Sequence, residues 1–228
     1  MLSRNLLLYL VSRFCSASAT MLLRAAIAWH VFSLSHSAFH LGLIGLVQFL
    51  PIPTLMLVGG ALADVYDRRR IMMVAQAAPL VSATLLWSAT RDGWVSLPLL
   101  YAMVLVSGIS WAFDSPSRAS LLPTLVPRAV FPRAVTLAAT TQALAFATGP
   151  ALSGLVIAQA GIAPVYAVYV GLILFALVGL TLLRAPRRER GLRTVSLRAI
   201  REGLAFVWRN QVVFGCMLLD MMARFNNL

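Results

Sequence analysis

Long, uninterrupted apolar segments run through almost the whole of this 228-residue chain. Hydrophobic residues make up 60% of the sequence, charged residues make up 11%, and the mean hydropathy is +0.85, which a soluble domain of this size does not carry. A helix needs about 20 apolar residues to cross a bilayer, so the chain has room for about six or seven spans. A membrane β-barrel would instead show segments of alternating polarity. We therefore expect an all-α membrane protein.

The apolar segments predict six transmembrane helices, which cover approximately residues 14–34, 41–63, 71–89, 95–113, 134–158 and 165–183. We expect a short polar turn at 35–39 and a longer, proline-containing loop at 114–133. The chain then divides into a six-helix bundle (1–183), an arginine-rich linker (184–210) and the start of an incomplete seventh span (211–228). Within the linker, residues 197–208 have the spacing of an amphipathic helix, which either lies on the lipid surface or tethers two halves.

The basic residues, nineteen arginines and no lysine, predict the orientation of the chain. Sixteen arginines fall before the first span, between the second and third, between the fourth and fifth, or after the sixth, whereas the other set of connections holds only Arg91. Because arginine-rich connections stay in the cytoplasm, we expect a cytoplasmic N-terminus. The net charge of +12 is thus spread over four connections, which argues against nucleic-acid binding.

The connection after the second span carries the most informative motif, Gly59-Gly60-Ala61-Leu62-Ala63-Asp64-Val65-Tyr66-Asp67-Arg68-Arg69-Arg70. Glycines near a helix end let another helix approach closely. Asp64 places a carboxylate at the negative end of a helix dipole, so it needs a nearby cation or the N-terminus of another helix. An ordinary charged turn would account for the arginines but not for the Gly-x-Leu-Ala-Asp spacing.

This segment resembles the loop signature of the major facilitator superfamily, G-x-L-A-D-R-x-G-R-R, with Val65 in place of an arginine and Asp67 in place of a glycine. Asp67 is a substitution familiar in the bacterial drug and siderophore efflux branch, which includes enterobactin-exporter-like proteins. The resemblance implies a gating role for the loop, in which Asp64 engages a helix of a second six-helix half. The residues implied are Gly60, Leu62, Ala63, Asp64, Asp67, Arg68, Arg69 and Arg70.

A second motif lies in the fifth span, where Ala145, Gly149 and Ser153 form a stripe of small residues at four-residue spacing. Such a stripe permits close helix packing, and Pro150 permits a bend. Simple packing is one reading of this stripe. The other is functional, because Gly149, Pro150, Ser153 and Gly154 resemble the antiporter signature G-P-x-x-G-G of the same superfamily.

Arg24 is the clearest charge inside the predicted membrane spans. It follows Arg13 by eleven residues, about 16 Å along a helix, which places it near the bilayer midplane. Arg13, Ser16, Thr20 and Arg24 share one helix face, so we expect this polar stripe to line an aqueous cavity. Thr20 and Arg24 either contact a substrate, or Arg24 is satisfied by carbonyls of a neighbouring helix. His30 is expected to be an interfacial polar residue near the outer end of the span.

Together with these features, the resemblance implies one half of a secondary transporter in a bacterial inner membrane that exports a drug or siderophore in exchange for protons. The expected partners are lipid, a small-molecule substrate, the proton, and a second six-helix half or a homologous transporter. No cofactor or metal is expected, since the seven acids form no metal-binding cluster, and this also argues against a membrane enzyme.

Two alternatives remain. A six-helix protein could bind or regulate a full-length transporter without transporting. The membrane domain of an ATP-driven exporter is the other, but the short second-to-third loop with its signature argues against it. The stretch from Val212 to the end is interrupted by Asp220, Arg224 and two asparagines, which suggests a truncated product.

Overall fold

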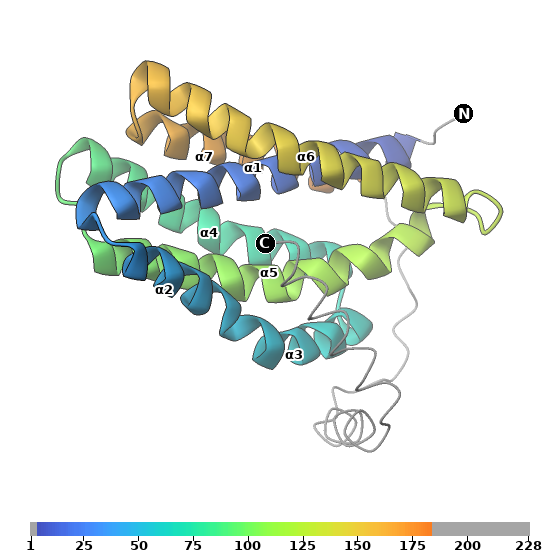
Figure 1. Ribbon diagram of the computed structural model, residues 1–228. Coiled ribbons are helices and arrows are strands. Elements are labelled where there is room, and N and C mark those ends of the chain that lie inside the picture. Colours follow the sequence, from blue (N-terminus) through green and yellow to red (C-terminus); the bar gives the residue numbers. More distant parts are fainter. Residues whose placement is uncertain (1–3, 184–228) are drawn as a thin grey trace. The chain divides into compact units, whose positions relative to one another are not determined.

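The computed structural model describes residues 4–183, apart from the side chains of Pro53, Thr54, Leu57 and Asp64, and this part of the chain is helical throughout. Its elements are α1 (Arg4–Ser35), α2 (Ala38–Phe49), α3 (Pro51–Val65), α4 (Arg68–Arg91), α5 (Leu97–Leu125), α6 (Phe131–Ala160) and α7 (Ala163–Leu182) (Figure 1). All but α2 and α3 are long and apolar enough to cross a membrane. The expected all-α membrane fold is confirmed, while the predicted linker (184–210) and seventh-span start (211–228) lie outside the described residues.

The predicted second span is divided into α2 and α3 by a break at Leu50. Leu50 keeps a helical conformation (φ −51°, ψ −45°), and its amide donates to the Leu46 carbonyl at 3.0 Å. Pro51 and Pro53 have no N–H, so the helical hydrogen bonds that these positions would donate are missing. Together α2 and α3 therefore form a broken helix, in which α3 continues in the same general direction as α2 (Figure 1).

The predicted loop at 114–133 is wrong, because α5 continues to Leu125 and only residues 126–130 separate it from α6. Pro116 and Pro123, which the predicted loop includes, both lie inside α5. In membrane proteins, side chains and neighbouring helices compensate for the hydrogen bonds that such prolines remove. Pro116 leaves the Ala112 carbonyl without its helical N–H donor. The hydroxyl of Ser117, the next residue, donates to the neighbouring Phe113 carbonyl at 2.8 Å.

The helices form two groups (Figure 1). In the first, α1 packs along α6 and α7, and in the second, α5 packs along α4 and α3. Contacts between α4 and α7 join the groups, whereas α1 and α5 touch much less. The region between α1 and α5, where these two helices touch little, is here called the wedge. One end of the bundle, here called the arginine-rich end, carries Arg68–Arg70, Arg128 and Arg133, and the opposite end carries Ser35 and Arg91.

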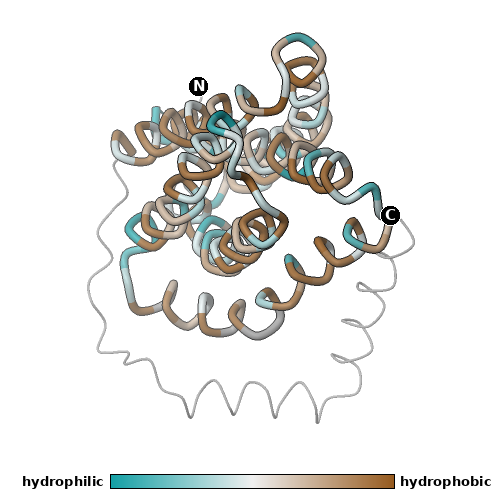
Figure 2. The backbone as a smooth tube through the Cα atoms, turned by 90° about the vertical axis from the view of Figure 1, so that its left-hand side faces the viewer, coloured by the Kyte–Doolittle hydropathy of each residue, from teal (hydrophilic) through white to brown (hydrophobic). Residues whose placement is uncertain are grey.

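Two apolar clusters fill the interior, and a polar layer separates them along α1. The cluster towards the opposite end includes Leu22, Ile27 and Tyr166, and the cluster at the arginine-rich end includes Leu6 and Tyr9. Between them α1 presents small polar residues, Ser12 and Ser16, both of them buried. Figure 2 shows hydrophobic residues along most of each described helix, as expected for a lipid-facing exterior.

Candidate functional site

A cavity of about 290 Å³ lies in the wedge between the two helix groups. Helices α1 and α7 form one side, and α2, α4 and α5 form the other. Most of its walls are apolar, with side chains such as Leu23, Ile44, Val104 and Ile173, and a few polar groups are set among them. This combination is typical of small-molecule binding sites, and the volume is at the small end of their range.

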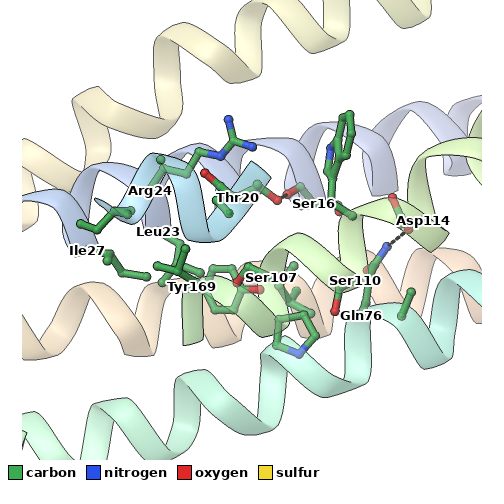
Figure 3. A pocket seen from close by; sticks show the side chains of 18 of the residues that line it. Ser16, Thr20, Leu23, Arg24, Ile27, Gln76, Ser107, Ser110, Asp114 and Tyr169 are labelled. Carbon is green, nitrogen blue, oxygen red and sulfur yellow. Dashed lines mark hydrogen bonds between the residues drawn. The ribbon is translucent and has the colours of Figure 1, made fainter. Parts of the chain in front are cut away.

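The polar side of the cavity comes largely from one face of α1. Ser16, Thr20 and Arg24 follow one another at four-residue spacing, and all three line the cavity (Figure 3). Arg13, which the sequence places on the same stripe, does not line it. Its Nε donates instead to the Ala138 carbonyl of α6 at 3.2 Å.

Arg24 is exposed at the edge of the cavity, and its nearest polar partner is Gln48 of α2. In the amide orientation that satisfies both side chains, the Gln48 oxygen accepts from Arg24 Nε at 3.0 Å and from Nη2 at 3.3 Å. Gln48 stands just before the break at Leu50, which brings α2 close to the cavity. Because an amide carries no charge, this partner orients the guanidinium without neutralising it.

The floor of the cavity, towards the arginine-rich end, holds a buried ion pair within α5. Arg118 Nε donates to Asp114 Oδ2 at 2.9 Å, and Arg118 Nη2 donates to Asp114 Oδ1 at 3.1 Å. The two side chains are only 7% and 16% exposed. The amide of Gln76 on α4 donates to Asp114 Oδ1 at 2.9 Å, which is the dashed line in Figure 3. Asp114 therefore lines the cavity with its charge already compensated.

Further contacts tie this ion pair to α1. Arg118 Nη2 lies 3.4 Å from the hydroxyl of Ser16, and the hydroxyl of Tyr9 donates to the Arg118 carbonyl at 3.2 Å. The Arg118 Nη1 and Gln76 Oε1 atoms are buried and have no hydrogen-bond partner among the described residues. The layer between the two apolar clusters is thus a polar network that spans α1, α4 and α5.

This network was not predicted from the sequence, because residues 114–133 were assigned to a loop. Residues 114 and 118 are four positions apart, which places them on the same face of a helix, and Asp-Arg pairs at this spacing are favourable. That signal was present in the sequence. Pro116 lies between the two residues and favours a loop, so the Asp114–Arg118 ion pair was not predicted.

The loop signature ends α3 and starts α4. Ala63 is buried, and the Leu62 carbonyl accepts from the Tyr66 amide at 2.8 Å, which closes the last turn of α3. Asp67 is the N-cap of α4, since its Oδ1 accepts from the Arg69 amide at 2.9 Å. Gly60 has open space around it, and the side chain of Asp64 lies outside the description.

Two of the three loop arginines reach carbonyl groups of other helices. Arg68 Nη1 donates to the Ser120 carbonyl of α5, and its Nε donates to the Ala63 carbonyl at 3.2 Å. Arg69 Nη2 donates to the Thr181 carbonyl of α7 at 2.5 Å. Arg70 is exposed. The loop is therefore anchored to α5 and α7 at the arginine-rich end.

The small-residue stripe of α6 packs on α1. Ala145, Gly149 and Ser153 are all buried. A Cβ atom at Gly149 would lie 2.5 Å from Met21 Cβ and 2.8 Å from the Ser18 carbonyl oxygen, so the two backbones approach too closely for a side chain. Pro150 and Gly154 face outwards, and Gly154 has open space around it. The four residues of the antiporter signature, Gly149, Pro150, Ser153 and Gly154, do not line the cavity described above.

His30, which the sequence predicts to be an interfacial polar residue, is buried between α1 and α7. It is 4% exposed, and its Nδ1 lies 2.7 Å from the hydroxyl of Tyr166 on α7. A comparable pair joins α2 to α5, where His40 Nδ1 lies 2.6 Å from the Tyr101 hydroxyl. Both pairs connect helices near the opposite end of the bundle.

Comparison with known proteins adds a family match. The family model described as transmembrane secretion effector matches residues 6–223. The chain is 30% identical to the multidrug efflux pump Tap of Mycobacterium tuberculosis over 210 residues, which are 86% of this chain and 49% of Tap. It is 23% identical to macrolide efflux protein A of Streptococcus pyogenes over 209 residues, 90% of this chain and 51% of that protein.

A third relative is the staphyloferrin A transporter of Staphylococcus aureus, which is 26% identical over 132 residues. This match covers 57% of the present chain and 33% of the transporter. The chain therefore spans about half the length, or less, of the curated relatives that it matches.

Proposed function

Because this chain belongs to the transmembrane secretion effector family of the major facilitator superfamily, we propose that it is one half of an exporter for a small molecule, a drug or a siderophore. Members of this superfamily are transporters rather than enzymes, and the chain is a multi-pass membrane protein. Two of its relatives are named as efflux proteins, which supports export as the direction, and a third is named as a transporter of staphyloferrin A.

The observation that carries this proposal is the cavity between α1 and α5. It lies inside a helix bundle, has a mainly apolar wall, and carries an uncompensated guanidinium, Arg24, at its edge. A charge at this depth on an exposed face is costly in lipid, so the face with Arg24 requires water or protein against it. A second six-helix bundle would supply that cover, and the cavity would become one side of a central substrate site in which Thr20 and Arg24 contact the substrate.

Coupling to protons is the second part of the proposal. Rocking of two six-helix bundles about a central site accounts for alternating access, and a proton gradient supplies the driving force in the bacterial inner membrane. The loop signature gates this motion at the arginine-rich end, which we propose to be cytoplasmic. The anchoring of Arg68 and Arg69 on carbonyls of α5 and α7 supports this role, because it makes the loop move together with the bundle. The stripe with Gly149 and Ser153 supports rigid packing of α6 on α1 during the same motion.

The test is gradient-driven dye efflux in inverted membrane vesicles. The chain is assayed alone and joined to the C-terminal half of a related exporter, with and without a protonophore. We expect efflux only from the joined protein, and only with an intact proton gradient. Efflux by the short chain alone would contradict the half-exporter proposal. Inhibition of a co-expressed full-length homologue, without efflux by the joined protein, would favour the regulatory alternative.

A matched pair of glycines on α2 ties the activity to the cavity. Gly45 lines the cavity, whereas Gly42, nearly one turn earlier, does not, and a Cβ at either position meets no atom within 4 Å. Gly45→Trp should therefore fill the cavity and abolish efflux by the joined protein. Gly42→Trp should leave efflux intact. Equal activity of the two variants would show that the substrate does not pass through this cavity.

A further inference from the structure

The charges around the cavity do not balance. Arg24 contributes one positive charge at its edge, and the described side chains place no carboxylate within ion-pair distance of it. Asp114 is the other charged residue that lines the cavity, but it is paired with Arg118, which lies directly behind it. The three groups together carry one net positive charge, located at Arg24.

Two hydroxyls that line the cavity, those of Thr20 and Ser107, have the same bias. The hydroxyl of Thr20 donates to the Ser16 carbonyl at 2.9 Å, and that of Ser107 donates to the Met103 carbonyl at 2.9 Å. Each hydroxyl has a single proton, so both now offer only acceptor oxygens to the cavity. Arg24 has donors to spare, because Gln48 occupies only its Nε and Nη2 edge and its Nη1 donates to no described residue.

From this arrangement we propose that the cavity selects organic anions with an apolar body, such as aryl carboxylates, over cations of the same shape. The guanidinium fork suits a carboxylate, and Gln48 holds it in place before the ligand arrives. The apolar body would contact the wall around Leu23, Val104 and Trp111. A cationic ligand would meet the uncompensated charge of Arg24, and the one carboxylate in the cavity wall is already held by Arg118 and Gln76.

This inference rests on the proposed function, because it takes the cavity as the substrate site, but a binding measurement tests it separately. Three probes share the dansyl group and differ in charge: dansylglycine is an anion, dansylamide is neutral, and N-(2-aminoethyl)dansylamide is a cation. Binding to the full 228-residue chain, in nanodiscs of phosphatidylcholine, is read from dansyl fluorescence sensitised by tryptophan, since Trp111 lines the cavity. Empty nanodiscs provide the background.

We expect wild-type protein to bind dansylglycine most tightly and the cation most weakly. Arg24→Gln should weaken dansylglycine binding about 10- to 100-fold, the range of a charge-assisted hydrogen bond. It should change the affinity for dansylamide less than about twofold, because this probe offers no charge to the guanidinium. Arg24→Lys, which keeps the charge but loses the fork, should give an intermediate affinity. Arg91→Gln is the matched control: it removes the same charge from an exposed position at the opposite end of the bundle and should change none of the affinities.

Equal affinities of the three probes for wild-type protein would overturn the inference, as would undetectable binding of dansylglycine or an equal loss of all three in Arg24→Gln. The wild-type comparison needs no variant, so a folding defect in a variant cannot obscure it. The efflux assay separates this inference from the proposed function. Efflux of a neutral dye without any anion preference in binding would reject only the substrate class. Anion-selective binding without efflux by the joined protein would reject only the export function.

Discussion

Asp114 and Arg118 face each other one helical turn apart on α5, with 2.9 Å between the carboxylate Oδ2 and the guanidinium Nε. Gln76 and Ser16, from α4 and α1, complete the surroundings of this pair. The network lies between the two apolar clusters of the bundle and closes the cavity towards the arginine-rich end. Its members come from three helices, so its stability reports on whether these helices are packed together.

Breaking this pair on one side should destabilise the bundle. Asp114→Asn leaves the buried Arg118 without its counter-ion, and the loss of one partner of a buried ion pair typically costs about 3–5 kcal/mol. The double variant Asp114→Asn with Arg118→Gln should be less destabilised than the sum of the two single variants. Thermal unfolding in detergent, followed by circular dichroism, measures all three. Strict additivity of the effects would mean that the pair contributes nothing as a pair.

Gly149 should be intolerant of a side chain, because α6 meets α1 there. A Cβ would lie 2.8 Å from the Ser18 carbonyl oxygen, so Gly149→Ala must separate the two backbones at an expected cost of about 1–3 kcal/mol. Gly154→Ala, on the same helix but facing open space, is the control and should be neutral or slightly stabilising. The midpoint of thermal unfolding distinguishes the two variants. If both behave alike, the close approach of α1 and α6 is not required.

Gly59 and Gly60, the adjacent glycines of the loop signature, should also differ in their tolerance of a side chain. A Cβ at Gly59 would lie 2.5 Å from the Ala112 carbonyl oxygen of α5, whereas one at Gly60 meets no atom within 4 Å. Pro116 has no N–H to donate to that carbonyl, and α3 passes close to it at Gly59. Gly59→Ala should therefore lower the unfolding temperature. Gly60→Ala should leave the unfolding temperature unchanged or raise it, since alanine in a helix is more favourable than glycine by up to about 1 kcal/mol in the free energy of unfolding. The opposite order would indicate that α3 is rotated relative to this structure.

The buried pair of His30 and Tyr166 should stabilise the contact between α1 and α7. Tyr166→Phe removes the hydroxyl 2.7 Å from His30 Nδ1 and leaves a buried nitrogen without its partner, which costs about 1–3 kcal/mol. Tyr101→Phe removes the corresponding partner of His40, but that pair is only partly buried, so water can replace the hydroxyl and the cost should be smaller. Unfolding midpoints of the two variants provide the comparison. A larger loss for Tyr101→Phe would contradict the difference in burial.

The sequence could predict the fold class and the approximate position of most spans, because both depend on local properties. A bilayer requires about 20 apolar residues per helix, and such runs can be counted along the chain without knowledge of their neighbours. The four-residue spacing of Ser16, Thr20 and Arg24 is a local property as well, and it sufficed to place these residues on one face. The small residues around Gly149 could be recognised as a packing surface for the same reason.

The tertiary structure alone decided which groups meet across helices. Three features depend on how the helices are rotated against one another. They are the partner of Arg24, the close approach at Gly59 rather than at Gly60, and the burial of His30 against Tyr166. The continuation of α5 through Pro116 belongs to the same class, because the compensation for a missing hydrogen bond comes partly from neighbouring helices. Apolar length is thus fixed by the sequence and the bilayer, whereas the pairing of polar groups is fixed by packing between segments far apart in the chain.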